Sequence, residues 1–242
     1  MTREKERLWL IIFNIYDMEL TSTHKLILNL IIKSSLDKKF YWTGGTLLSH
    51  YYLHHRLSYD LDFFTDTNFS YDTLLPFISI LKEMTGIKHL EPTKIYDRWE
   101  FIIHKPESLR FEFVFYNHEK KRLSPLLAYQ GILIDSLADI SANKIIALFD
   151  RNEPKDLFDV YTLLVQKKYT VPQLLDLAEK KFGVKFSEFS FWSECTKSFP
   201  LLDSLKPYLF PKEKNKKDLL GNIKEFFLSQ GKDYLEKEFG NR

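Results

Sequence analysis

The sequence lacks several features that would assign it to a specialised class of protein. It has one cysteine in 242 residues, which excludes an internal disulfide, and Cys195 in SFWSECTKSF has no neighbouring histidine or second cysteine. No run reaches the roughly 18 apolar residues that a membrane span needs. The start, MTREKERLWLIIFNIYDMEL, is interrupted by Asn14 and Asp17, and no small-residue cleavage site follows. These absences predict a buried structural thiol and a cytoplasmic protein without a membrane partner.

The chain also lacks a strong net charge. Its 35 Lys and Arg against 33 Asp and Glu give a formal net charge of +2, so any affinity for nucleic acid must come from a local patch. The run KEKNKKD at 212–218 is either the solvated start of a helix or such a patch. Aromatic residues are abundant, and 21 Phe predict a core built largely from packed rings.

Hydrophobic periodicity divides the chain into two parts. Strand patterns occur in KFYWTGG, SYDLDFF, IYDRWEFIIH and LRFEFVFY, the last two separated by the turn-like KPES. Helical patterns accompany them: an N-terminal stretch, THKLILNLIIKSSL with Thr21 or Ser22 as its cap, the brief TLLSHYYLHHR, and YDTLLPFISILKEMTG ending at Gly86. From about residue 123 the patterns are helical. We therefore predict an α/β (α+β) fold, with a mixed sheet flanked by helices in 1–122 and a helical region in 123–242.

Two aspartates lie on one of these otherwise apolar strands. Because side chains alternate along a strand, Asp60 and Asp62 in SYDLDFF point to the same side. Like charges this close are unfavourable unless one is protonated or a cation lies between them. An exposed strand face is the ordinary explanation, but the flanking Leu61, Phe63 and Phe64 indicate a mostly buried strand. The pair predicts a site for Mg²⁺ or Mn²⁺, hard cations that take oxygen ligands.

A third acid lies on the later strand LRFEFVFY. Glu112 stands between two phenylalanines and is a candidate third metal ligand beside Asp60 and Asp62. Arg110 shares the face of Glu112, so a salt bridge between these two residues is the alternative. The sequence leaves both roles of Glu112 open.

A pair of glycines follows the strand KFYW. Gly44 and Gly45 would let the backbone approach a triphosphate closely, and Thr46 opens the next helix, whose N–H groups favour anions. A simple strand-to-helix turn would explain the glycines by themselves. Together with the two aspartates downstream, they predict the phosphate-binding turn of a nucleoside triphosphate site.

The helical region carries a second charged group. Lys144 and Arg151 are two helical turns apart and share a face, while Asp156 and Asp159 are one turn apart on the next helix. A lysine ammonium can bind nucleotide phosphates, and either aspartate can orient it or the attacking hydroxyl. Surface ion pairs between adjacent helices are the alternative.

Three histidines lie close together in the sequence. His50 and His54 are one helical turn apart, with His55 adjacent, a spacing that also occurs in metal sites. No Glu or Cys completes such a site, so we expect partly exposed helix histidines near the phosphate pocket rather than a zinc site.

Two sequence motifs occur in a particular order. TGGT at 43–46 is followed by RLSYDLDFF at 56–64, in which Arg56, Ser58, Asp60 and Asp62 fit the pattern R-x-S-x-D-x-D. SANKIIALFDRNEPKDLFDVYTLL at 141–164 fits K-x-x-A, then Arg, then (K/R)-D-x-x-D-x-Y, through Lys144, Ala147, Arg151, Lys155, Asp156, Asp159 and Tyr161. Over residues 40 to 165, the chain resembles the AbiEii/AbiGii toxin family of the DNA polymerase β-like nucleotidyltransferase superfamily. After about residue 170 it shows no resemblance of this kind.

The resemblance implies a nucleotidyltransferase that transfers a nucleoside monophosphate from a nucleoside triphosphate (NTP), with Mg²⁺ or Mn²⁺, to an acceptor hydroxyl. The expected catalytic residues are Asp60, Asp62, Lys144 and Asp156, and the expected nucleotide-binding residues are Gly44, Gly45, Thr46, Arg56, Ser58, Arg151 and Asp159. The resemblance also implies an RNA acceptor, the 3′ end of tRNA, and a toxin that a separately encoded antitoxin neutralises. The candidate RNA-binding cations are Lys167, Lys168, Lys180, Lys181, Lys214, Lys216 and Lys217.

Other functions are compatible with the same fold. The acceptor could be a small hydroxylated metabolite, an antibiotic or a protein side chain, and a basic groove long enough for RNA would argue against these. A non-catalytic nucleotide-binding module would be expected to have lost at least one of Asp60, Asp62, Lys144 and Asp156, which are all present. A nucleic-acid-binding protein without catalysis leaves the paired acids unexplained.

Overall fold

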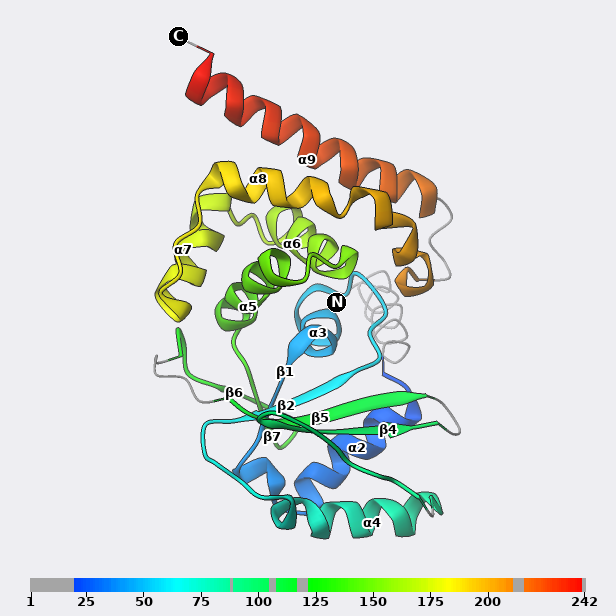
Figure 1. Cartoon of the computed structure of the whole chain (residues 1–242). Helices are drawn as coiled ribbons and strands as arrows, with labels where there is room; N and C mark the ends of the chain where they lie inside the picture. The colour runs from blue at the N-terminus through cyan, green and yellow to red at the C-terminus, as the bar shows by residue number, and fades with distance from the viewer. Residues whose placement is uncertain (1–19, 88, 105–107, 117–121, 211–215, 241–242) are drawn as a thin grey trace, which may run out of the picture. The chain divides into compact units, whose positions relative to one another are not determined.

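The computed structural model describes residues 20–87, 89–104, 108–116, 122–210 and 216–240 (Figure 1). The chain forms two compact units. Unit 1 comprises Met1–His54, Ser58–Glu119 and Pro125–Ser136, and unit 2 comprises His55–Leu57, Lys120–Ser124 and Leu137–Arg242. The expected N-terminal helical stretch up to residue 19, most of the turn KPES, and Lys214 lie outside the described residues.

Unit 1 is built on a seven-stranded mixed sheet with the strand order β3-β4-β5-β2-β1-β7-β6. The strands are β1 (Tyr41–Thr43), β2 (Leu61–Thr65), β3 (Thr93–Ile95), β4 (Arg98–Ile103), β5 (Leu109–Phe115), β6 (Leu127–Tyr129) and β7 (Ile132–Ile134). β1 runs parallel to β7 and β2 runs parallel to β5, whereas the other neighbours are antiparallel. The predicted α/β class with a mixed sheet is confirmed.

Helices cover both faces of this sheet. They are α2 (Ser22–Lys33), α3 (Gly44–Leu47) and α4 (Leu75–Thr85), with 3-10 turns at Leu36–Lys38 and Tyr71–Leu74 and a π-helix at Leu48–Leu53. Figure 1 shows α2 and α4 on one side of the sheet and α3 on the other. Thr21 caps α2 in a capping box with His24, and Gly86, in the left-handed conformation, ends α4. Both ends agree with the sequence prediction.

The core between α4 and the sheet consists largely of aromatic rings. Phe77 on α4 packs edge-on against Phe111 and Phe113 of β5, and Phe101 of β4 stacks on Phe111. These rings are fully buried. Edge-to-face and stacked pairs of this kind add to the free energy gained from burying area alone. The prediction of a ring-packed core is confirmed.

Two predictions about strands were wrong. IYDRWEFIIH is not one strand, because Tyr96 has a φ of +50° and turns the chain between β3 and β4. The chain after residue 122 is not purely helical either, since β6 and β7 add a hairpin to the edge of the sheet. Its turn, Gln130 and Gly131, has positive φ at both positions, as two-residue hairpins favour.

Unit 2 is helical. Its elements are α5 (Leu137–Asp150), α6 (Pro154–Gln166), α7 (Val171–Phe182), α8 (Glu188–Lys197), a 3-10 helix (Phe199–Tyr208) and α9 (Lys216–Phe239). Thr170 caps α7 at its start, and Gly183 follows its end in the left-handed conformation. α9 packs along α8 (Figure 1), where Gly231 lies against Trp192.

Cys195 lies on α8 and is fully buried. Burial raises the pKa of its thiol well above the ordinary value, with a smaller contribution from Glu194. A neutral, inaccessible thiol is unreactive, so the prediction of a structural cysteine is confirmed. In the part of the chain that is described, no helix combines the length and apolar character needed to cross a bilayer.

Candidate active site

A row of polar residues crosses one face of the sheet in unit 1. Thr43 of β1 pairs with Asp62 of β2, which pairs with Glu112 of β5. Glu112 in turn pairs with Glu100 of β4. Directly paired residues project to the same side of a sheet, and Asp60 precedes Asp62 by two residues. The register therefore brings Asp62, Glu112 and Glu100 to one face, as predicted for Asp62 and Glu112, and Asp60 lies directly before β2.

Gly44 lies directly against the carboxylate of Asp62. The residue has a φ of +81°, and a Cβ built on it would overlap the carboxylate, lying 2.6 Å from Asp62 Cγ. Only glycine therefore lets the turn after β1 approach Asp62 so closely. Gly44, in the predicted phosphate-binding turn, therefore has to be glycine because Asp62, one of the predicted metal ligands, occupies the space of a side chain.

Substituting Gly44 tests this close approach. Gly44→Ala is expected to displace the Asp62 carboxylate and to lower nucleotidyl transfer by roughly 100-fold, because an error of about 1 Å in positioning has an effect of that size. Gly86→Ala is the matched control, since Gly86 also has positive φ but has no atom within 4 Å of the added Cβ. It should lose about 1 kcal/mol of stability and keep activity. Equal activity losses in the two variants, measured as kcat/KM, would contradict the assignment.

Thr46 and Ser58 hold the start of β2. The Thr46 hydroxyl donates to the carbonyl of Asp60 and lies 2.9 Å from Ser58 Oγ. Thr46 is buried, whereas Ser58 is half-buried. The Thr46 side chain thus fixes the backbone that carries Asp60, and of the two hydroxyls that of Ser58 is the more accessible to a ligand.

Arg110 is a member of the site that the sequence did not identify. Its Nη2 lies 3.0 Å from Asp60 Oδ2, and its Nη1 lies 3.0 Å from Glu100 Oε2 and 3.2 Å from Glu112 Oε2. Burial lowers the pKa of Arg110, but these carboxylates outweigh it and raise the pKa above its ordinary value. The salt bridge left open for Glu112 is present in the structure, and Arg98 adds a second at 3.2 Å.

Asp135 was also missed. It follows β7 and is buried, and its Oδ2 accepts a hydrogen bond of 2.9 Å from the hydroxyl of Thr43, the residue before Gly44. Its carbonyl accepts from the Tyr52 hydroxyl at 2.7 Å. Asp135 therefore ties the end of β1 to the π-helix that follows the glycines. In the sequence, the feature that could have identified Asp135 is an acid directly after the apolar residues 132–134.

Asp60 and Asp62 fit a divalent cation better than Glu112 does. The Asp60 side chain is 40% exposed, so ligand oxygens can reach it, and two carboxylates with substrate phosphates and water suit Mg²⁺. Glu112 is buried and its carboxylate already accepts from two guanidiniums. Among the residues that the structure describes, no three His, Cys, Asp or Glu side chains form a metal-binding group.

In unit 2, Asp159 is the centre of a buried ionic network. It is fully buried and accepts from Arg56 through Nε at 2.6 Å and Nη2 at 2.9 Å. His55 Nε2 lies 2.7 Å from one carboxylate oxygen and Lys144 Nζ 2.7 Å from the other. Burial raises the pKa of Asp159, but Arg56 and Lys144 overcome it and hold the pKa well below the usual range. Arg56, expected at a phosphate, is buried and bonds Asp159 and the carbonyl of Leu57.

Asp156 forms the other half of this network. Lys144 Nζ lies 2.8 Å from Asp156 Oδ1, and Arg151 approaches the same carboxylate at 2.7 and 3.0 Å. Burial opposes ionisation, yet Lys144 and Arg151 lower the pKa of Asp156. The spacing correctly placed these side chains together, but the alternative of surface ion pairs is wrong, since Asp156 and Asp159 are fully buried.

The network predicts a pH dependence of stability. Burial lowers the pKa of His55 although Asp159 opposes this, so below about pH 6.5 the unfolded chain binds a proton before the folded chain does. Stability should therefore fall as the pH drops from 6.5 through the folded pKa. His55→Gln should weaken this dependence in thermal unfolding between pH 7 and 5. An unchanged slope in His55→Gln would contradict the prediction.

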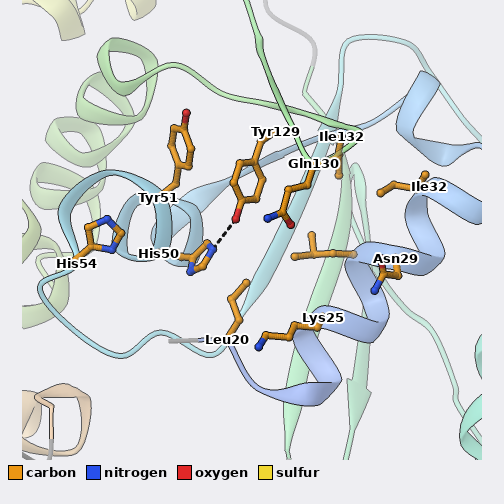
Figure 2. Close-up of a pocket in the computed structure, with 11 residues that line it drawn as sticks. Leu20, Lys25, Asn29, Ile32, His50, Tyr51, His54, Tyr129, Gln130 and Ile132 are labelled. Carbon is orange, nitrogen blue, oxygen red and sulfur yellow. Dashed lines mark hydrogen bonds between the residues drawn. The ribbon is translucent and has the colours of Figure 1, made fainter. Parts of the chain in front are cut away.

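The other two histidines line a separate cavity in unit 1, of about 730 Å³ (Figure 2). Its wall comes from α2, the π-helix and the β6–β7 hairpin. Figure 2 shows His50 directed at the Tyr129 hydroxyl, 2.9 Å away, and His50 also stacks on Trp42. The lining residues are Leu20, Lys25, Leu28, Asn29, Ile32, His50, Tyr51, His54, Tyr129, Gln130 and Ile132. The predicted site residues are absent from this lining, and the histidines do not converge on a metal site.

The candidate RNA-binding lysines differ in accessibility. Lys167, Lys168, Lys180 and Lys217 are exposed. Lys181 is buried and pairs with Asp139 at 2.9 Å, so it cannot contact RNA. Lys216 donates to the carbonyls of Lys206 and Leu209.

Comparison with known proteins identifies the family of this chain and the structures that share its fold. Residues 26–233 match the model of the nucleotidyl transferase AbiEii toxin family, of type IV toxin–antitoxin systems, and the chain belongs to this family. An uncharacterized protein of Aquifex aeolicus is 24% identical over 211 residues, covering 85% of this chain and 93% of that protein.

Two solved structures from Helicobacter pylori share the fold. JHP933 is 18% identical with a TM-score of 0.54, and covers 90% of this chain and 97% of its own. A proposed nucleotidyltransferase is 19% identical with a TM-score of 0.55, and covers 89% of this chain and 99% of its own. The resemblance seen in the two motifs is confirmed, and the match to the family model extends well beyond residue 170.

Proposed function

We propose that the chain transfers a nucleoside monophosphate from an NTP to a hydroxyl of RNA, with Mg²⁺ or Mn²⁺ bound by Asp60 and Asp62. The observation that carries this proposal is the placement of Asp62 against Gly44, with Asp60 two residues away, directly before β2. An ordinary strand-to-helix turn has no need for an acid against its glycine. At this turn a carboxylate lies beside backbone that carries no side chain. The carboxylate can bind a metal ion and the backbone can approach phosphates closely, as a metal-bound triphosphate requires.

The residues of unit 1 have distinct roles in this proposal. When bound, the metal ion would neutralise charge on the triphosphate and polarise its phosphoryl oxygens. Gly44 and Gly45 leave room for the phosphates, and the accessible Ser58 hydroxyl donates to one of them. Thr46 and Asp135 fix the backbone on either side of the glycine turn. As the acceptor hydroxyl releases its proton to water, its oxygen bonds the α-phosphorus, the bond to the bridging oxygen breaks, and pyrophosphate leaves.

Lys144 and Asp156 are the other two residues that we propose nucleotidyl transfer requires. Their ion pair of 2.8 Å keeps the lysine charged, because Asp159 and Asp156 raise the pKa of Lys144 against the effect of burial. A permanently charged ammonium suits the stabilisation of phosphoryl charge. For Arg56 and Asp159, the buried bidentate pair supports a structural role instead of the nucleotide-binding one expected from the sequence.

Membership of a toxin–antitoxin family supports a proposal for the partner, and the resemblance of the two motifs supports one for the acceptor. We propose the 3′ end of tRNA as the acceptor, a cytoplasmic location, and a separately encoded antitoxin as the partner that neutralises the activity. The exposed Lys167, Lys168, Lys180 and Lys217 are candidates for the backbone contacts. A small molecule or a protein side chain is the second class of acceptor.

A labelling experiment tests the proposal. The purified chain is incubated with Mg²⁺, total bacterial RNA and each labelled NTP in turn, and the products are resolved on a denaturing gel. Label should enter a tRNA-sized band with at least one NTP, disappear with EDTA, and return with added Mg²⁺ or Mn²⁺. Label in protein or in a small product would replace RNA as the acceptor. Absence of transfer to any acceptor would overturn the function.

A further inference from the structure

We propose that Arg110 is a built-in counter-cation of the carboxylate site and competes with the metal ion for Asp60. This inference rests on the proposed metal-dependent function and adds a residue to it. Arg110 would hold the acids together before the metal binds, and metal binding would displace its guanidinium from Asp60.

The contacts of Arg110 support this role. Its two terminal nitrogens divide their contacts, Nη2 with Asp60 at 3.0 Å, and Nη1 with Glu100 at 3.0 Å and Glu112 at 3.2 Å. One planar guanidinium thus bridges acids that come from β4, from β5 and from the residue directly before β2. A cation at the meeting point of several carboxylates occupies the electrostatic position of a metal ion.

Asp60 is the carboxylate for which Arg110 and a bound divalent ion would compete. Because two cations on the same carboxylate repel each other, binding of the ion to Asp60 weakens the contact with Arg110.

Burial determines which contact of Arg110 is released. The side chains of Arg110 and Asp60 are 33% and 40% exposed, so they can separate without repacking of the core. Glu112 is only 7% exposed in its side chain and would remain paired with Arg98 and Arg110. The expected movement is therefore a small swing of the guanidinium toward Glu100 and Glu112.

Binding of Mn²⁺ alone, without nucleotide, tests the competition. The full chain is titrated with Mn²⁺ by calorimetry or by the loss of the free-ion electron paramagnetic resonance signal. Arg110→Gln should bind Mn²⁺ about fivefold more tightly than the wild type, the size of effect expected for a partly exposed charge pair. Arg110→Met, also neutral, should give the same result if Arg110→Gln folds poorly.

Two further variants control the interpretation. Arg98→Gln removes the same charge from the same face, but among the described residues Arg98 pairs with Glu112 and not with Asp60, so its affinity should change less than twofold. Asp62→Asn should lose Mn²⁺ binding. If Arg110→Gln binds no more tightly while Asp62→Asn loses binding, the competition is overturned and the metal site stands. If Asp62→Asn binds as the wild type does, both the competition and the proposed metal site fail.

Discussion

Asp60→Ala is expected to lower nucleotidyl transfer by about 100- to 1000-fold, the loss typical of removing a group that acts on transition-state charge. Stability should change by no more than about 1 kcal/mol, because Asp60 and its partner Arg110 are both partly exposed and their pair is screened by solvent. Arg110 would also keep Glu100 and Glu112 as partners. The measurements are kcat/KM in the labelling assay and the midpoint of thermal unfolding.

A second aspartate near the same strand distinguishes the effect of losing a negative charge from the effect of losing the Asp60 carboxylate at its particular position. Asp66 directly follows β2 and is exposed, so Asp66→Ala removes the same charge a short distance along the chain. It should retain activity within about a factor of three, since exposed charges at that distance are largely screened. Full activity in Asp60→Ala would refute the metal assignment. Equal losses in both variants would point to the general charge of the surface instead.

The elements predictable from the sequence are those with local causes. Alternation over LRFEFVFY identified β5, and the cap at Thr21 and the stop at Gly86 mark helix ends through contacts within a few residues. β6 and β7 have three residues each, too few for a periodic pattern, and β7 is held in place by pairing with β1 about 90 residues earlier in the chain. Such long-range pairing leaves no local trace.

The same limit applies to the candidate site. Alternation placed Asp60 with Asp62, and Arg110 with Glu112, but the contact of Arg110 with Asp60 depends on the parallel register of β2 and β5. Helical spacing grouped Lys144 with Arg151, and Asp156 with Asp159, but gave no indication of burial, which depends on packing. The pair of Arg56 and Asp159 joins residues 103 positions apart, and the family motif suggested a phosphate for Arg56 instead.

Asp159→Asn is expected to destabilise unit 2 by about 3–5 kcal/mol, because removal of one partner leaves buried charges uncompensated. Asp159 is fully buried and its carboxylate contacts Arg56, His55 and Lys144. The amide carries no charge and can accept through only one oxygen, so it cannot hold the bidentate guanidinium. Thermal unfolding should shift downward by roughly 10 °C.

Asp156→Asn is the matched comparison on the same helix. The side chain of Arg151, one partner of Asp156, is 50% exposed and can turn toward water. Lys144, the other partner, keeps its contact with Asp159. The loss of stability in Asp156→Asn should therefore be smaller than in Asp159→Asn, about 1–2 kcal/mol. The two variants should rank the other way in activity, so that Asp156→Asn, the less destabilised, loses more of its transfer rate. At a temperature where both variants are folded, Asp156→Asn should lose most of its transfer rate, while Asp159→Asn should keep a larger share. If Asp159→Asn is as stable as the wild type but inactive, its carboxylate acts in the chemistry, and the structural role given to the pair with Arg56 is wrong.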